Sequence, residues 1–162
     1  MATCCFLGHS NYCSYSSAEY KAKLTDVIEN LIVDYAVDTF YCGRRGDFDL
    51  LCWRITSELI NKYPQVKIYH VLSYIPTDTD ERSTEAKLRD EIQTVYLLEE
   101  YVPPKYAIAR TNQCMVDLSD YIVTGVDHTY GGANAALEYA ERKQKKIIYL
   151  DPRREKENKY ER

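Results

Sequence analysis

One stretch of the chain, from Arg110 to Glu138, constrains the fold more than any other. A segment with helical spacing ends at Asp120, an apolar run covers 121–124, Gly125 follows, and a glycine pair stands at 131–132. This order predicts a helix, a buried strand, a glycine turn and a second helix. A glycine pair at a helix start lets the chain pass close to an anion, while N–H groups and the positive end of the helix dipole point at it. The stretch therefore predicts phosphate-binding geometry.

The rest of the chain alternates between short β-rich runs and longer segments with helical spacing. We predict strands at 3–7, 39–42, 66–74, 93–98, 121–124 and 146–150, and helices at about 17–36, 47–59, 103–118 and 131–143. The polar segment 77–89 has the composition of a loop or a surface helix. Strands that alternate with helices predict an α/β, Rossmann-like fold, with a mostly parallel sheet and helices on both faces. We expect one domain over residues 1–151 and a charged C-terminal tail over 152–162.

Composition limits the classes of function. The chain has 162 residues, 45% of them hydrophobic, which suits a single core. Its net charge is −4, and acidic and basic residues are mixed, so no basic stripe is available for a nucleic-acid backbone. We therefore do not expect nucleic-acid binding. The first residues resemble no signal peptide and no apolar run approaches ~18 residues, so we expect a cytoplasmic chain without membrane contact.

The six cysteines indicate buried thiols rather than a metal site or disulfides. They form no Cys-x-x-Cys pair, and several lie in apolar segments, as Cys5 and Cys42 do. Four zinc ligands would have to be gathered from scattered cysteines and three histidines. We expect no metal and no cofactor, and no nucleophilic role for Cys5 or Cys42.

Three glycine turns follow predicted strands, and in a parallel sheet all three lie at the carboxyl edge, where ligands bind. Polar residues stand beside these glycines and offer charge and hydrogen bonds to a phosphorylated, ribose-bearing molecule. The alternative is that each glycine only turns the chain and that the polar residues form a solvated rim. The candidate ligand-binding residues are Gly8, His9, Ser10, Gly43, Arg44, Gly46, Asp47, Gly125, Gly131, Gly132 and Asn134.

These residues resemble the SLOG superfamily, named for the Smf/DprA proteins and the Lonely Guy cytokinin-activating enzymes. The resemblance covers nearly the whole chain. The opening residues Cys4 to His9 and the segment from Tyr106 to Glu138 look like the short YpsA-like branch. The resemblance implies a Rossmann-like nucleotide-binding fold. It also implies a homodimer, formed through the helix after Pro104 or through the final helix.

The Lonely Guy enzymes carry a Pro-Gly-Gly-x-Gly-Thr-x-x-Glu pattern, which falls here on residues 130–138. The glycine pair and Glu138 match, whereas the proline, the third glycine and the threonine do not. The position of the enzymes' catalytic arginine falls on Thr111, and Arg110 is its neighbour. If the resemblance extends to activity, Glu138 and Arg110 are the catalytic residues. Otherwise Glu138 is a solvated helix residue or a partner of Arg142 four positions on.

Two functions of different classes follow. The first is a binding module for a phosphorylated nucleoside or nucleotide-derived ligand, such as an ADP-ribose-like signal, at the carboxyl edge of the sheet. The alternative is an N-glycosidase of the phosphoribohydrolase type, in which Glu138 steadies an oxocarbenium-like ribose. A third function, binding of single-stranded DNA as in the DprA relatives, is disfavoured by the acidic balance.

Overall fold

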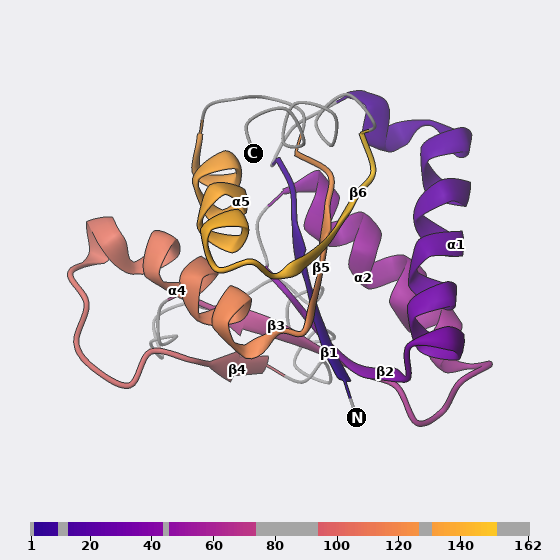
Figure 1. Cartoon of the computed structure of the whole chain (residues 1–162), viewed down its shortest axis with the longest axis horizontal. Helices are drawn as coiled ribbons and strands as arrows, with labels where there is room; N and C mark the ends of the chain where they lie inside the picture. Colours follow the sequence, from indigo (N-terminus) through magenta and orange to yellow (C-terminus); the bar gives the residue numbers. More distant parts are fainter. Residues whose placement is uncertain (1, 10–12, 44–45, 74–93, 127–130, 152–162) are drawn as a thin grey trace, which may run out of the picture.

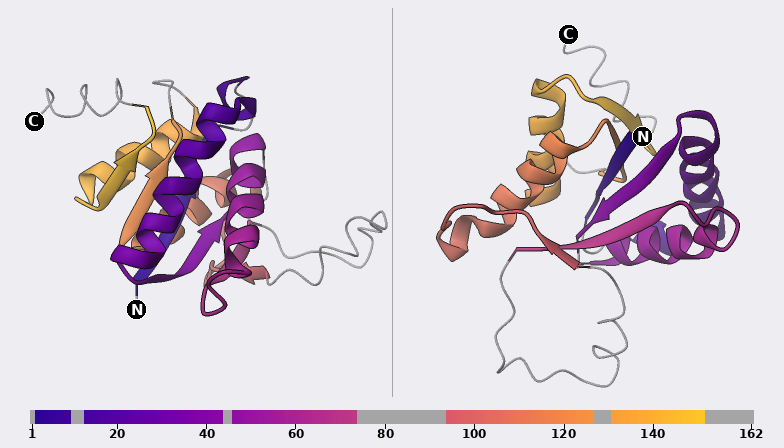
Figure 2. Two further views of the ribbon diagram at one scale, coloured as in Figure 1. Left: turned by 90° about the vertical axis from the view of Figure 1, so that its right-hand side faces the viewer. Right: turned by 90° about the horizontal axis from the view of Figure 1, so that it is seen from below.

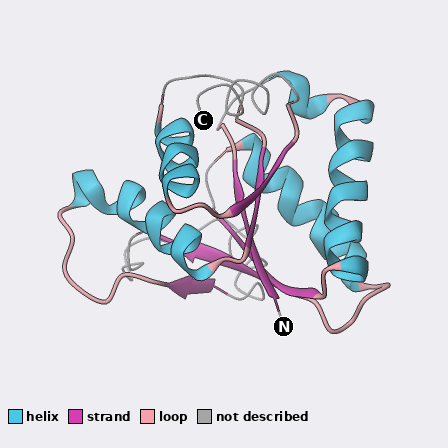
Figure 3. Cartoon of the chain, viewed as in Figure 1, coloured by secondary structure: helices cyan, strands magenta, loops and turns pink. Residues whose placement is uncertain are grey.

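The structure is a computed structural model that describes residues 2–9, 13–43, 46–73, 94–126 and 131–151. Strands alternate with helices along the chain (Figures 1 and 3). The elements are β1 (Ala2–Leu7), the 3-10 helix η1 (Cys13–Ser16), α1 (Ala18–Asp34), β2 (Val37–Cys42), α2 (Asp47–Ile60), β3 (Lys67–Leu72), β4 (Thr94–Tyr96), α4 (Pro104–Leu118), β5 (Tyr121–Thr124), α5 (Gly132–Arg142) and β6 (Lys146–Tyr149). The predicted helices and strands in these ranges are confirmed, with ends that differ by a few residues. The segment 77–89 and the tail 152–162 lie outside the described residues.

All six strands form one parallel sheet in the order β4-β3-β2-β1-β5-β6. The chain builds outward from β1 through β2 and β3 to β4, and then returns to place β5 on the other side of β1. The strand order therefore reverses at β1 and β5, which is where Rossmann-like sheets bind ligands. The views from two further directions show α1 and α2 on one face and α4 and α5 on the other (Figure 2). The predicted α/β, Rossmann-like fold is confirmed.

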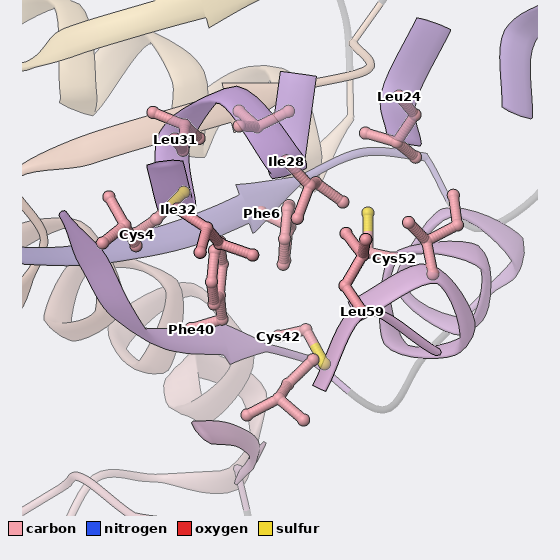
Figure 4. Packing of buried hydrophobic residues seen from close by; sticks show 14 of the residues in the cluster. Cys4, Phe6, Leu24, Ile28, Leu31, Ile32, Phe40, Cys42, Cys52 and Leu59 are labelled. Atoms are coloured by element: carbon pink, nitrogen blue, oxygen red, sulfur yellow. The ribbon is translucent and has the colours of Figure 1, made fainter. Parts of the chain in front are cut away.

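Each face of the sheet has its own core, because successive side chains of a strand point to opposite faces. Cys4 and Phe6 of β1 join the core under α1 and α2, where Phe6 stacks on Phe40 with ring centroids 5.6 Å apart (Figure 4). Cys5 and Leu7 join the core under α4 and α5. Both helical layers thus bury the alternating side chains of a single strand.

The thiols of Cys4, Cys5, Cys42 and Cys52 are fully buried in these cores. Desolvation raises the pKa of all four thiols, that of Cys5 to about 12. A protonated, inaccessible thiol is a poor nucleophile. The prediction of buried thiols is confirmed for these four residues.

Candidate functional site

The candidate site lies where the strand order reverses, at the carboxyl ends of β1 and β5. These strands are paired in register, with Leu7 beside Thr124. The carboxyl ends of β1 and β5 lie at the upper edge in Figure 1. Gly8 and His9 follow β1, and Gly125 follows β5, so these residues come together at this edge. The first residues of α5 lie at the same edge, because a helix that connects parallel strands runs back along the sheet.

The N-terminus of α5 has the properties of an anion site. Gly131 caps the helix with φ 92° and makes no side-chain capping hydrogen bond, and the first turn holds no acidic residue. A Cβ placed on Gly131 or Gly132 would meet no atom of the described residues within 4 Å. The N–H of Ala135 bonds to the Gly131 carbonyl at 3.0 Å, and the N–H groups before it have no carbonyl within the helix. Such a helix end attracts a phosphate.

The N-terminus of α2 starts in the same way but is less suited to an anion. Its cap, Gly46, has φ 96° and also lacks a side-chain capping bond, yet Asp47 and Asp49 occupy the first turn. Two carboxylates at a helix N-terminus stabilise the helix and repel a further negative charge. Gly43 makes room for one of them, because a Cβ there would lie 2.8 Å from the Asp49 carboxylate. Arg44, expected beside this turn, lies outside the described residues.

Gly8 and Gly125 have a packing role that the sequence did not reveal. A Cβ placed on Gly8 would lie 2.2 Å from the Phe48 ring, and one on Gly125 would lie 2.5 Å from it. The ring of Phe48, from the first turn of α2, thus rests on both glycines and is fully buried. Phe48 therefore belongs to the core under α1 and α2 at this edge.

Tyr15 joins the two loops that follow β1 and β5. Its hydroxyl accepts a hydrogen bond from the His9 N–H at 2.9 Å and donates one to the Gly125 carbonyl at 2.8 Å. The ring is 4% exposed and packs on Tyr20 and Phe48, with centroids 5.2 and 5.1 Å away. Sequence reasoning missed Tyr15, because nothing in the sequence distinguishes it from the other tyrosines of this segment.

His9 and Asn134 are the buried polar residues of the candidate set. His9 follows the end of β1 and is 9% exposed. Asn134 is 4% exposed and donates from Nδ2 to Oε1 of Glu138 at 3.1 Å. Within the described residues, Glu138 makes no ion pair with Arg142, so the alternative of an i, i+4 pair is not observed. Ser10 lies outside the described residues.

The two candidate catalytic residues share no hydrogen bond or ion pair. Arg110 is exposed on α4, where its Nη1 donates to Oε1 of Gln113 at 3.0 Å, and it has no hydrogen bond or ion pair with Glu138. Thr111, at the position of the enzymes' arginine, is 2% exposed and donates to the Ala107 carbonyl at 2.7 Å.

The described ranges contain no group of three His, Cys, Asp or Glu side chains that could hold a metal ion. None of their helices is long and apolar enough to cross a membrane.

Comparison with known proteins shows similarity in structure but not in sequence. No family model matches the chain, and no curated protein matches it. DNA processing protein A (DprA) from Streptococcus pneumoniae matches 91% of this chain with a TM-score of 0.64 and 14% identity. DprA from Helicobacter pylori matches 91% with a TM-score of 0.58 and 17% identity. The chain spans 50% and 64% of the lengths of these two proteins.

The comparison corrects one expectation. The H. pylori protein is described as having a single-stranded DNA binding mode, so our expectation that a chain of this kind does not bind nucleic acid was wrong. The physical reason is that binding of single strands depends on a local groove and stacking surfaces, which the net charge of a chain does not reveal.

DprA is one of the proteins for which SLOG is named, so the resemblance is supported at the level of the fold. The chain has the Rossmann-like fold of the DprA proteins.

Proposed function

We propose that this protein binds a phosphorylated nucleoside or nucleotide-derived ligand at the carboxyl edge of its sheet, with a phosphate at the N-terminus of α5. The observation that supports the proposal is the first turn of α5, which holds no acidic residue and which no side chain of the described residues caps or covers at Gly131 and Gly132. Phosphate is the ligand that such a helix end favours. An ADP-ribose-like molecule would satisfy the same requirement.

The same proposal assigns supporting roles to two buried polar residues. His9 and Asn134 lie at this edge, at the end of β1 and in the first turn of α5, where they can hydrogen-bond the sugar or the phosphate. It also treats residues 1–151 as one domain of the short YpsA-like kind, followed by the tail 152–162. Gly8 and Gly125 shape the edge through Phe48 rather than by contacting the ligand.

Single-stranded DNA is a second candidate, because it presents the same phosphate to the same helix end. The fold match with two DprA proteins over 91% of the chain favours it. An N-glycosidase is a third candidate, favoured by the hydrogen bond that holds the Glu138 carboxylate to Asn134 in the first turn of α5. If the protein is an N-glycosidase, Glu138→Gln should abolish the release of free base and leave the affinity for the nucleotide largely unchanged.

The proposal is tested by a thermal-shift screen against nucleoside monophosphates, NAD, ADP-ribose and cyclic nucleotides, with mass spectrometry of each mixture afterwards. A ligand at ~100 times its dissociation constant should stabilise the protein by about 2.7 kcal/mol. Recovery of intact ligand supports the binding module, and release of free base supports the N-glycosidase. Titration of a labelled oligonucleotide at low salt tests single-stranded DNA.

The decisive variant is Gly132→Asp, with Gly132→Asn as its neutral control. A carboxylate in the first helical turn should stabilise α5 by about 0.3–1 kcal/mol and at the same time repel a phosphate. We expect Gly132→Asp to fold at least as stably as the wild type and to lose most of the ligand-induced shift, whereas Gly132→Asn keeps it. An undiminished shift in Gly132→Asp would overturn the proposed site.

A further inference from the structure

We propose that this protein binds a second copy of itself through two exposed segments of opposite charge. The first, the acidic segment, lies in the loop between β4 and α4 and consists of Glu99, Glu100 and Tyr101. The second, the basic turn, covers residues 142–146 and joins α5 to β6. Its cations are Arg142, Lys143, Lys145 and Lys146. The inference does not depend on the proposed ligand, because neither segment holds a residue of the candidate site.

The acidic segment is exposed and is anchored on both sides. Glu99 and Glu100 are exposed, and the Tyr101 side chain is 85% exposed. Leu98, which precedes them, is 8% exposed, and the two residues at 103–104 are prolines with a restricted backbone. Such a loop loses little conformational freedom on binding. Tyrosine is also enriched where proteins contact one another.

Two tyrosine rings support the cations of the basic turn. The guanidinium of Arg142 and the ammonium of Lys143 lie 6.0 and 5.4 Å from the centre of the Tyr139 ring. The ammonium of Lys146 lies 5.6 Å from the centre of the Tyr121 ring. All three cationic side chains are exposed, and none forms an ion pair with a carboxylate of the described residues. The turn therefore presents cations at defined positions to a partner.

The helix dipole explains only part of this charge. Cations near a helix C-terminus interact favourably with the dipole, which accounts for Arg142 in the last turn of α5 and for Lys143 beside it. Lys145 and Lys146 follow the end of the helix. The turn thus holds four cations in five residues, in a chain with a net charge of −4. An acidic protein segment is the complementary partner.

A nucleic acid fits the basic turn less well than the acidic segment does. The carboxylate of Asp117 accepts a hydrogen bond from the Tyr139 hydroxyl at 2.9 Å, so a negative charge lies among the cations. Lys145 donates to the Asp117 carbonyl at 3.3 Å, which places this residue beside the turn. Every unit of a nucleic-acid strand carries a negative phosphate, and the carboxylate repels it. The acidic segment carries charge only at positions 99 and 100 and can avoid this group.

The positions of the two segments allow a symmetric dimer. The acidic segment lies in the loop that leads into α4, and the basic turn lies at the lower end of α5 (Figure 1). The two form no ion pair within one copy. Because α4 and α5 cover the same face of the sheet (Figure 2), a two-fold axis between the segments exchanges them, and each dimer makes the contact twice. The contact uses the segments that flank these helices, whereas the family resemblance implies the helices themselves.

The first test is the molar mass of the full-length protein by light scattering and sedimentation at increasing concentration. At about 0.05 M NaCl we expect the mass to rise from 18.9 kDa toward twice this value. The dissociation constant should increase about tenfold at about 0.5 M NaCl, because salt screens exposed charges. Reversal of either segment, by Glu99→Lys with Glu100→Lys or by Lys143→Glu with Lys146→Glu, should also weaken the dimer about tenfold or more.

An equimolar mixture of these two double variants is the decisive measurement. The reversed acidic segment of one variant then faces the reversed basic turn of the other, and the two unchanged segments face each other in the second contact. We therefore expect the mixture to dimerise like the wild type, whereas each variant alone does not. The control is Lys21→Glu with Arg54→Glu, which makes the same change of net charge at exposed positions of α1 and α2 and should dimerise like the wild type.

Three results would overturn the proposal. They are a wild type that stays monomeric up to about 1 mM, a control variant that weakens the dimer as much as the segment variants do, and a mixture that stays monomeric. A monomeric wild type that binds a labelled oligonucleotide, with this binding lost in Lys143→Glu with Lys146→Glu, would assign the basic turn to nucleic acid instead.

Discussion

Gly8 and Gly125 have a packing role that does not depend on a ligand. Both follow strands and both lie at the carboxyl edge, but the Phe48 ring occupies the space that a Cβ would need. We predict that Gly8→Ala lowers the free energy of unfolding by about 1–3 kcal/mol, because the ring or the backbone must move. Gly132→Ala is the control, since a Cβ there meets no described residue within 4 Å. Urea denaturation measures both, and equal stability of the two variants would contradict the role of Phe48.

Tyr15 provides a second prediction at the scale of one residue. Tyr15→Phe removes the hydroxyl that joins the His9 N–H to the Gly125 carbonyl, and both groups are buried. Leaving buried polar groups unpaired should cost about 1–3 kcal/mol in the free energy of unfolding. Tyr106→Phe is the matched control, because Tyr106 is 54% exposed. If the two variants unfold at the same urea concentration, the bridge contributes nothing to stability.

At the scale of elements, our proposal places the anion at α5 rather than at α2 because the first turns of the two helices differ. The two helices share a glycine cap with positive φ, and they differ in the acidic residues of the first turn. Gly131 has φ 92° and ψ 174°, a region that only glycine adopts without strain. We predict that Gly131→Ala lowers the free energy of unfolding by about 1–3 kcal/mol, although the added methyl group meets no described residue. The melting temperature of Gly131→Ala is compared with that of Gly132→Ala. Because steric overlap is expected in neither variant, a lower melting temperature of Gly131→Ala alone measures the backbone strain.

At the scale of the whole molecule, the thiols report whether the two cores unfold together. Cys52 lies in the core under α1 and α2, and Cys5 in the core under α4 and α5. Both thiols have a raised pKa, and that of Cys5 moves from 9.0 to about 12. Between these values the unfolded thiol ionises while the folded one stays protonated, so a rise in pH through this range lowers the free energy of unfolding.

We predict that iodoacetamide at pH 9 leaves Cys4, Cys5, Cys42 and Cys52 unlabelled in the folded protein, because the thiolate is the reactive form. As urea is added, Cys5 and Cys52 should become labelled at the same concentration, since both cores rest on β1. Mass spectrometry of the peptides follows each site. Labelling of Cys5 well before Cys52 would show that the α4 and α5 layer opens separately.

Prediction from the sequence succeeded where short-range patterns decide the outcome. The apolar run 121–124 was located to the residue, and helix ends were within a few positions, as for α1, predicted at 17–36 and observed at 18–34. The candidate site was predicted less completely. The sequence placed Gly131 and Gly132 at a helix start, but it could not show that Arg110 is exposed on α4 while Thr111 faces the core. One residue on a helix turns a side chain by about 100°, so a shift of one position decides which of the two is buried.

The sequence by itself determined the alternation of strands and helices, and with it the parallel sheet, because hydrophobic periodicity and glycine turns act over a few residues. Only the tertiary structure decided which glycines face a neighbour and which face open space. Phe48 lies 40 residues from Gly8 and 77 from Gly125 in the chain, yet its ring rests on both. Tyr15 likewise joins two loops that are distant in sequence, since Gly125 is 110 positions further along the chain. Such contacts follow from the order of strands in the sheet, which no local pattern encodes.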